Sequence, residues 1–238
     1  PGGCFADTYH WKDGIGPKED RPSIVNVFWG GVTEDNSFGT HEFLDFCELV
    51  GIEPYLSINV GTGTVQEAKD WVEYVTSSNE SPMTELRKKN GRSEPWKVKF
   101  WGIGNENWGC GGEMAADYYA NIFRNYSAYI KGDDFQKVIC GPSDSDTEWT
   151  ETILSGLDDK LNLAQGLSMH YYTLPTGDWS QKGSSLDFEE DMWFSTLRNT
   201  MYVEDYIKQH LAIMDKYDSE GKIKLIVDEW GTWYDKLP

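Results

Sequence analysis

Short apolar runs alternate with segments of helical periodicity along the whole chain, and this alternation is the feature that most restricts the fold. The long extended runs end near residues 60, 104, 141, 172 and 229. Helical stripes lie between them, and the clearest covers residues 114–131 with a face of Tyr119, Ile122, Phe123, Tyr126 and Ile130. Strands that alternate with helices in this way predict a parallel sheet with helices outside it.

Turn and cap residues place the boundaries of several elements. A helix from Thr40 is expected to stop at Gly51, and Ser81-Pro82 is typical of a helix start. Further helices are predicted over residues 65–75, near 148–154 and over 193–217. Residues 24–29 form a short extended run, whereas residues 1–20 and 175–191 are predicted to be loops, the second of them a flexible lid.

Composition restricts the class of protein and of partner. The chain has 238 residues, of which 39% are hydrophobic and 14% aromatic, which fits a single domain. With 21 Lys and Arg against 40 Asp and Glu the formal net charge is -19, so phosphate backbones and anionic lipid surfaces would be repelled. We therefore expect no nucleic-acid and no membrane partner. No apolar run approaches the roughly 20 residues of a membrane span, and no leader is visible before Cys4.

The cysteines and histidines predict neither a disulfide framework nor a metal. Four cysteines are too few for such a framework and none shows C-x-x-C spacing, so reduced thiols are the expectation. The four histidines lack metal-ligand spacing. Eleven tryptophans are unusual, because their faces stack well on sugar rings, although Trp is also a large core residue.

Two of the strand-like runs end in an acid beside a tryptophan. The run from Lys97 leads to Glu106, and the run from Lys222 leads to Glu229. Carboxyl ends of buried strands are where α/β folds place their chemistry. Helix caps and salt-bridge partners also occupy strand ends, but two acids in the same setting favour a catalytic pair.

A pair of carboxyl groups is sufficient to split a glycosidic bond. One acid gives a proton to the leaving oxygen while the other stays ionised and meets the positive charge that develops at the anomeric carbon. No P-loop, G-x-S-x-G elbow or H-E-x-x-H motif is present, so no cofactor is expected.

At these residues the sequence closely resembles the α-L-arabinofuranosidases of glycoside hydrolase family 51. The matching segments span the whole chain and are residues 1–7, 9–17, 21–22, 51–62, 101–107, 170–172 and 228–230, with Trp233. The resemblance implies a (β/α)8 TIM barrel of which this chain holds about strands three to seven, with the first and eighth missing. Residues 1–238 would then be an incomplete catalytic barrel without the β-sandwich that usually accompanies it.

The resemblance also implies roles for individual residues. Glu106 matches the general acid/base and Glu229 the nucleophile of a retaining, double-displacement mechanism. Asn105 matches the residue that holds the sugar 2-hydroxyl, and His170 and Tyr172 match positions that orient the carboxylates. Cys4 matches a position that contacts the terminal sugar, and Trp29 and Trp233 match aromatic walls of the pocket. The alternative for Cys4, Trp29 and Trp233 is that they only pack in the protein interior. The alternative for His170 and Tyr172 is a purely structural role.

The expected activity is removal of terminal non-reducing α-L-arabinofuranosyl residues from arabinose-containing hemicellulose or oligosaccharides. Alternatives are a related retaining β-xylosidase or endo-glucanase, and a non-catalytic glycan-binding barrel that kept its aromatic cleft. The resemblance further suggests a homo-oligomer. The compartment is left open, with a leaning towards the cytoplasm.

Overall fold

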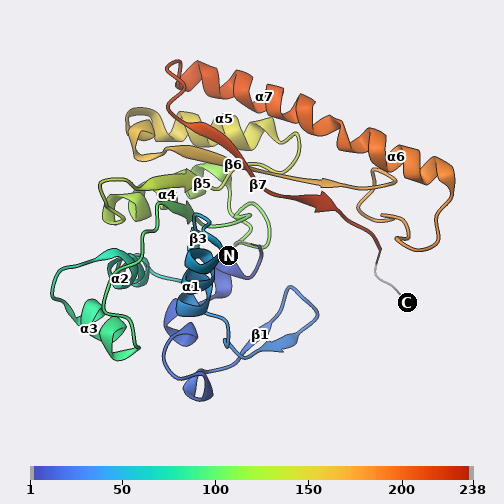
Figure 1. The fold of residues 1–238 in the computed structure, drawn as a ribbon. Helices are drawn as coiled ribbons and strands as arrows, with labels where there is room; N and C mark the ends of the chain where they lie inside the picture. The colour runs from blue at the N-terminus through green and yellow to red at the C-terminus, as the bar shows by residue number, and fades with distance from the viewer. Residues whose placement is uncertain (1–2, 236–238) are drawn as a thin grey trace.

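Five parallel strands form the framework of residues 3–235, which this computed structural model describes (Figure 1). Their spatial order follows the chain, so each strand pairs with the next. The strands are β3 (Tyr55–Ile58), β4 (Phe100–Ile103), β5 (Gln136–Ile139), β6 (Gly166–Thr173) and β7 (Lys224–Thr232). The prediction of five strands is confirmed, and their sequential parallel order is that of neighbouring strands in a TIM barrel.

Helices connect the strands and pack beside one another along the outside of the sheet. In Figure 1, α7 lies along one side of the sheet, with α5 beside it. The helices are α1 (Thr40–Val50), α2 (Val65–Thr76), α3 (Pro82–Lys89), α4 (Ala116–Tyr129), α5 (Thr147–Leu157), α6 (Glu190–Thr200) and α7 (Tyr202–Tyr217). A 3-10 helix, η4 (Asp158–Leu163), follows α5.

The helix boundaries follow from local chemistry. Gly51 ends α1 with a left-handed φ of 71°, which glycine adopts without steric cost. The side chains of Thr64, Ser81 and Asp146 each accept a backbone N–H at the start of the helix that follows. The helix predicted over residues 193–217 is instead two helices, because the chain breaks at Met201, whose N–H bonds to Arg198 and Asn199.

The segment before α1 is mostly irregular but well anchored. It contains the 3-10 helices η1 (Ala6–Thr8), η2 (Trp11–Gly14) and η3 (Lys18–Asp20) and a hairpin of β1 (Ile24–Asn26) and β2 (Val32–Glu34). The extended run predicted at residues 24–29 is therefore the first strand of this hairpin and its turn. Strand β2 has no counterpart in the sequence analysis, because three mostly polar residues carry no periodicity.

The core lies between the sheet and the helices. Trp101 and Ile103 of β4, Phe123 of α4 and Leu167 of β6 are all fully buried there. Within the described part of the chain β3 and β7 each pair on one side only, and Trp230 of β7 is 73% exposed. None of the helices in residues 3–235 combines the length and apolar character that a membrane crossing requires.

Candidate active site

A β-bulge brings two acids of β7 to one histidine of β6. Met169 pairs with Val227 and His170 pairs with Glu229, so Asp228 is the extra residue on β7. Neighbouring residues of a regular strand point to opposite faces, whereas a bulge changes the direction of the side chains around it. Asp228 and Glu229 consequently both reach the His170 imidazole.

Glu106 approaches the same imidazole from the loop that follows β4. His170 Nδ1 lies 2.9 Å from Glu106 Oε1 and 3.5 Å from Glu229 Oε2, and its Nε2 lies 3.2 Å from Asp228 Oδ1. One carboxylate oxygen of Glu106 and one of Glu229 are within 4.8 Å of each other. The two acids that the sequence analysis paired, 123 residues apart, therefore converge on one point at the carboxyl ends of the strands.

The electrostatics of this cluster come from burial and from its charges. Burial by itself lowers the pKa of His170, but hydrogen bonds to Asp228 and Glu106 and the surrounding negative charge raise it to about 10. Burial raises the pKa of Glu229, and the neighbouring Glu106 adds to this while His170 opposes it. The imidazole thus compensates carboxylates that would otherwise repel one another.

Tyr172 fixes the orientation of Glu229. Its hydroxyl donates a hydrogen bond of 2.8 Å to Glu229 Oε1. Burial, followed by the bond to Glu229, raises the pKa of the phenol well above its usual value, so the group stays a donor at neutral pH. Tyr172 and Glu229 belong to adjacent strands, which keeps this contact independent of loop movement.

The backbone of Glu106 is held in an uncommon conformation. Its φ is 47°, in the left-handed region that side chains other than glycine seldom adopt. The Glu106 carbonyl accepts the N–H groups of Gly109 and Gly111, which closes a tight turn. Such conformations cluster at functional sites, where the surrounding contacts enforce them.

The Asp7 side chain anchors this turn. The sequence analysis did not single out this residue. Its Oδ1 accepts the N–H groups of Val60 and Gly61, and its Oδ2 accepts the N–H of Asn105 at 2.8 Å and the Asn107 amide at 3.3 Å. Burial raises the pKa of Asp7 to about 6, although the four donors oppose the shift. One carboxylate therefore joins the ends of β3 and β4.

Asn105 precedes Glu106 and is nearly buried. Its Nδ2 is enclosed and finds no hydrogen-bond partner among the described residues. Buried donors are usually paired, so an unpaired amide in the residue next to Glu106 is a candidate contact for a bound polar group.

An aromatic cluster borders the acids. Trp233 lies at its centre, stacked on Trp29 of the β1–β2 turn at 5.7 Å and edge-on to Tyr172 at 4.9 Å. Trp179, from the loop between β6 and α6, packs against the other side of Trp233 at 5.6 Å. Trp29 and Trp179 are about half exposed, at 48% and 47%, so aromatic faces remain open to solvent.

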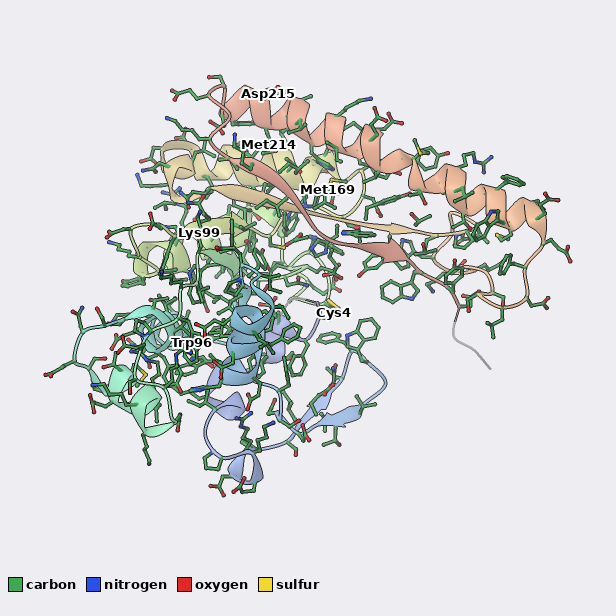
Figure 2. All side chains as sticks on the ribbon, in the orientation of Figure 1. Cys4, Trp96, Lys99, Met169, Met214 and Asp215 are labelled. Carbon is green, nitrogen blue, oxygen red and sulfur yellow. A yellow bond between two sulfur atoms is a disulfide. The ribbon has the colours of Figure 1, made fainter. Side chains whose placement is uncertain are left out.

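The expectation of four reduced thiols is wrong for two of them. Cys4 and Cys110 form a disulfide, while Cys47 and Cys140 are free and buried. Figure 2 labels Cys4 between the N-terminal half of the ribbon and β7. The bridge joins residues 106 apart in sequence, and spacing carries no sign of such a pairing. Its sulfurs lie 3.7 Å (Cys4) and 3.3 Å (Cys110) from Glu106 Oε2.

Two groups of potential metal ligands lie in this region. One is Cys4, Glu106 and Cys110, and the other is Glu106, His170 and Glu229, with the ligand atoms of each group within 4.8 Å of one another. Sequence spacing predicted no such group, because each group includes members from distant segments of the chain.

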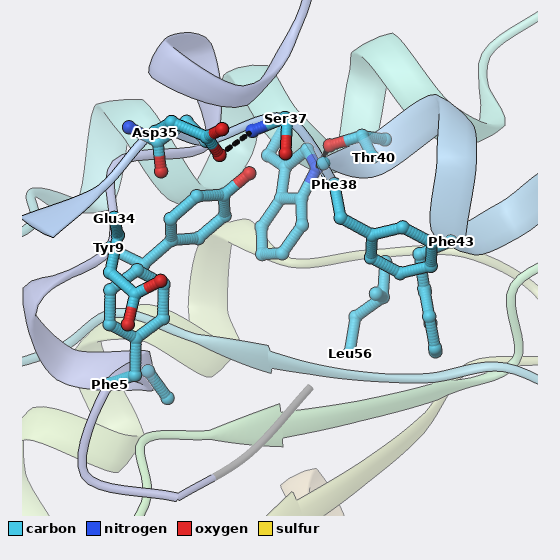
Figure 3. Close-up of a pocket in the computed structure, with 13 residues that line it drawn as sticks. Phe5, Tyr9, Glu34, Asp35, Ser37, Phe38, Thr40, Phe43 and Leu56 are labelled. Atoms are coloured by element: carbon cyan, nitrogen blue, oxygen red, sulfur yellow. Dashed lines mark hydrogen bonds between the residues drawn. The ribbon is translucent and has the colours of Figure 1, made fainter. Parts of the chain in front are cut away.

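A separate cavity of about 170 Å³ lies between the N-terminal loop, α1 and β3 (Figure 3). Phe5, Tyr9, Phe38, Phe43 and Leu56 contribute much of its apolar lining. Glu34 and Asp35 are its only carboxylates among the described residues, and neither belongs to the cluster around His170. The cavity therefore lacks the catalytic groups and we do not assign it a reaction.

Sequence reasoning missed Asp7, Cys110, Trp179 and a role for Asp228. Asp228 had a detectable signal, since it precedes Glu229 at a strand end. Cys110 and Trp179 lie in loops and Asp7 lies in the short 3-10 helix η1, where no periodicity indicates which way a side chain points.

Comparison with known proteins supports the family assigned from the sequence. The family model of the alpha-L-arabinofuranosidase 1 domain matches residues 1–194. An intracellular exo-alpha-L-arabinofuranosidase of Bacteroides ovatus is 54% identical over all of this chain and 46% of its own length. A probable alpha-L-arabinofuranosidase C of Aspergillus fumigatus is 44% identical over 63% of the chain and 30% of its own length.

Solved structures agree with this match. The GH51 arabinofuranosidase of Xanthomonas axonopodis pv. citri superposes with a TM-score of 0.95 at 48% identity, over 100% of this chain and 48% of that one. The alpha-L-arabinofuranosidase of Thermotoga maritima, in complex with arabinose, gives 0.84 at 34% identity, over 100% and 46%. The chain spans about half the length of the full-length relatives that it matches. It belongs to glycoside hydrolase family 51, the α-L-arabinofuranosidases.

Proposed function

We propose that the full-length protein carrying this chain is a retaining exo-α-L-arabinofuranosidase that removes terminal arabinofuranosyl residues from hemicellulose or oligosaccharides. The observation that carries the proposal is the approach of Glu106 and Glu229 to within 4.8 Å, measured between one oxygen of each. Retaining glycosidases hold their carboxyl groups about 5 Å apart, whereas inverting enzymes leave more than about 6.5 Å for a water.

In this mechanism Glu229 attacks the anomeric carbon while Glu106 gives a proton to the departing oxygen. The hydrogen bond from Tyr172 occupies Glu229 Oε1, so we assign Oε2, which lies 3.5 Å from His170 Nδ1, as the attacking atom. A glycosyl ester forms on Glu229 and the first alcohol leaves. Glu106 then removes a proton from water, the water oxygen bonds to the anomeric carbon, and the ester bond to Glu229 breaks.

His170 would keep the proton of Glu106 within reach through both steps. An imidazolium can donate to Glu106 and Asp228 together. Alternatively, a protonated Glu106 can donate to Nδ1 while Nε2–H donates to Asp228. Both arrangements use the same 2.9 Å and 3.2 Å contacts, so Glu106 can change its protonation state without displacing the imidazole.

Substrate recognition is assigned to Asn105 and the aromatic residues. The unpaired Nδ2 of Asn105 would bind the 2-hydroxyl, a contact that strengthens in the transition state. Trp29 and Trp233 offer stacked rings for the sugars beyond the cleaved bond. Cys4 borders the pocket through its bridge to Cys110. The Bacteroides ovatus relative of this chain is named intracellular, which supports the cytoplasm as the compartment of the full-length protein.

The proposal is tested with a panel of nitrophenyl glycosides on the full-length protein. Hydrolysis of the α-L-arabinofuranoside with a product of retained anomeric configuration is expected. Glu229→Ala should abolish turnover. Glu106→Ala should slow substrates with poor leaving groups most, and azide should restore the rate. Preference for the xyloside or glucoside, or an inverted product, would overturn the proposal.

A further inference from the structure

The Cys4–Cys110 disulfide lies against Glu106, the carboxylate that must gain and lose a proton in the proposed mechanism. Cys110 Sγ is 3.3 Å and Cys4 Sγ is 3.7 Å from Glu106 Oε2, whereas Oε1 of the same group faces His170. Bridged sulfurs carry no proton and are poor metal ligands. Reduced sulfurs are different, because thiolates are among the strongest ligands for soft divalent metals.

We propose that Cys4, Cys110 and Glu106 form a redox-gated site for a soft divalent cation such as Zn²⁺ or Cd²⁺. The bridged form cannot bind the cation, and the reduced form binds it through two thiolates and Glu106 Oε2. The inhibitory consequence rests on the function proposed above, since a coordinated Glu106 can neither give nor take a proton. Binding itself does not depend on that function.

The spacing of the three ligand atoms fits such a site. With metal–sulfur bonds of about 2.3 Å and a metal–oxygen bond of about 2.1 Å, a tetrahedral centre places sulfur and oxygen about 3.6 Å apart. The two sulfur–oxygen distances already bracket this value. Only the sulfurs have to separate, and once the bond is broken each side chain can turn about its own Cα–Cβ bond.

The backbone positions Cys4, Cys110 and Glu106 close to one another. Cys110 belongs to the turn closed by the bonds from Gly109 and Gly111 to the Glu106 carbonyl, so two ligands share one rigid segment. Cys4 lies just before the loop that Asp7 ties to the end of β3. All three residues are partly exposed, so a cation and a solvent ligand for the fourth position can reach them.

The chemistry balances with a named reductant. A dithiol reductant breaks the S–S bond by exchange, leaving two thiols on the protein and a disulfide on the reductant. The cation then displaces both thiol protons as it binds. In a reducing compartment, exchange with such a reductant favours the reduced pair.

The test uses the full-length protein, a phosphine reductant that does not itself bind the metal through sulfur, and Cd²⁺. Cadmium–thiolate bonds absorb in the ultraviolet, so binding is read without reference to activity. We expect no absorption band and unchanged hydrolysis when Cd²⁺ is added to the oxidised protein. After reduction, Cd²⁺ should produce the band and abolish hydrolysis, and a chelator should reverse both effects.

Matched variants assign the band to Cys110 and Glu106. Cys110→Ser should lose it although Cys47 and Cys140 remain, and Glu106→Gln should weaken Cd²⁺ binding by about tenfold or more. A band of equal size in Cys110→Ser, or no band in the reduced protein, overturns the proposal. Should Cys110→Ser fail to fold, the oxidised protein serves as the control of identical sequence. If the reduced protein shows the Cd²⁺ band but has no arabinofuranosidase activity before the metal is added, only the proposed function is refuted.

Discussion

At the scale of single residues, Glu106 is one of five described non-glycine residues with a positive φ, and the only one of the five in the acid cluster. Its φ of 47° is enforced by the turn and by Asp7, which accepts the N–H of the preceding residue. A side chain at such a position costs of order 1 kcal/mol or more, which glycine avoids. The protein therefore tolerates local strain where it places the proposed acid/base.

We predict that Glu106→Gly is more stable than Glu106→Ala by about 1 kcal/mol, because both remove the charge but only glycine relieves the backbone. Urea unfolding of the two variants measures the difference. The matched pair Glu73→Gly and Glu73→Ala lies inside α2, where the order should reverse because glycine weakens a helix. Equal stability of the two Glu106 variants would contradict the strain argument.

Asp7 provides the second prediction at this scale. In Asp7→Asn an NH₂ group opposes the N–H of Asn105 or of Val60, so a buried donor loses its acceptor at a cost of about 1–3 kcal/mol. The turn that carries Glu106 loosens, and kcat should fall more than KM rises. Unfolding and steady-state kinetics test this against Asp187→Asn, an exposed control that should change neither. An Asp7→Asn enzyme with unaltered kcat would refute a positioning role.

At the scale of elements, the β1–β2 hairpin reaches the site through one side chain. The hairpin is only three residue pairs long, yet its turn places Trp29 on Trp233, near the end of the chain. The sheet supplies the acids and this separate element supplies an aromatic face. Under the proposed function, substrate length and acid chemistry would therefore be carried by different parts of the molecule.

Trp29→Ala is expected to raise KM for arabinose-bearing oligosaccharides with little change in kcat. An aromatic stacking contact contributes about 0.5–1.5 kcal/mol, which corresponds to roughly a two- to tenfold change. Phe28→Ala is the control, because Phe28 is similarly exposed and forms no ring pair among the described residues. An equal KM for Trp29→Ala and Phe28→Ala would show that Trp29 does not contribute to substrate binding.

The elements themselves could largely be predicted from the sequence. Periodicity and caps located α1, α2, α3 and the five long strands, because each is fixed by local burial and local hydrogen bonds. The two acids were found because a strand end limits where its next residue can lie. The Cys4–Cys110 bridge, the Asp7 network and the bulge at Asp228 were not found, since each depends on contacts between distant segments that local patterns do not encode.

At the scale of the whole molecule, the described sheet is open at both ends. Strands β3 and β7 have unpaired outer edges within residues 3–235, and apolar side chains such as Trp230 are exposed beside them. Open apolar edges pair with other chains. The charge of -19 opposes such association, but it is spread over the chain and screened by salt.

We predict that residues 1–238 expressed alone associate at about micromolar concentration and bind a hydrophobic dye. Analytical ultracentrifugation measures the association, and raising the ionic strength should increase it. The full-length protein, measured in parallel, should bind the dye weakly. A monomeric isolated chain with one cooperative unfolding transition would show that the open edges are tolerated.

The charge cluster around His170 joins β4, β6 and β7, so its protonation affects the stability of the whole sheet. The folded-state pKa of about 10 lies above the unfolded value near 6.5, and the native state therefore holds a proton that the unfolded chain releases in between. Stability from this source is complete below pH 6.5. It falls by up to about 1.4 kcal/mol per pH unit as the pH rises towards 10.

His170→Asn should flatten this slope while lowering stability at neutral pH, because three carboxylates lose their compensating group. His210 is the matched control: it is also buried, but burial lowers its pKa, so it titrates below neutral pH and His210→Asn should keep the wild-type slope between pH 7 and 10. Urea unfolding across this range decides the matter. If the free energy of unfolding of the wild-type protein does not change from pH 7 to 10, His170 is neutral in the folded protein. The repulsion among Glu106, Asp228 and Glu229 would then have to be relieved by protonation of these acids instead.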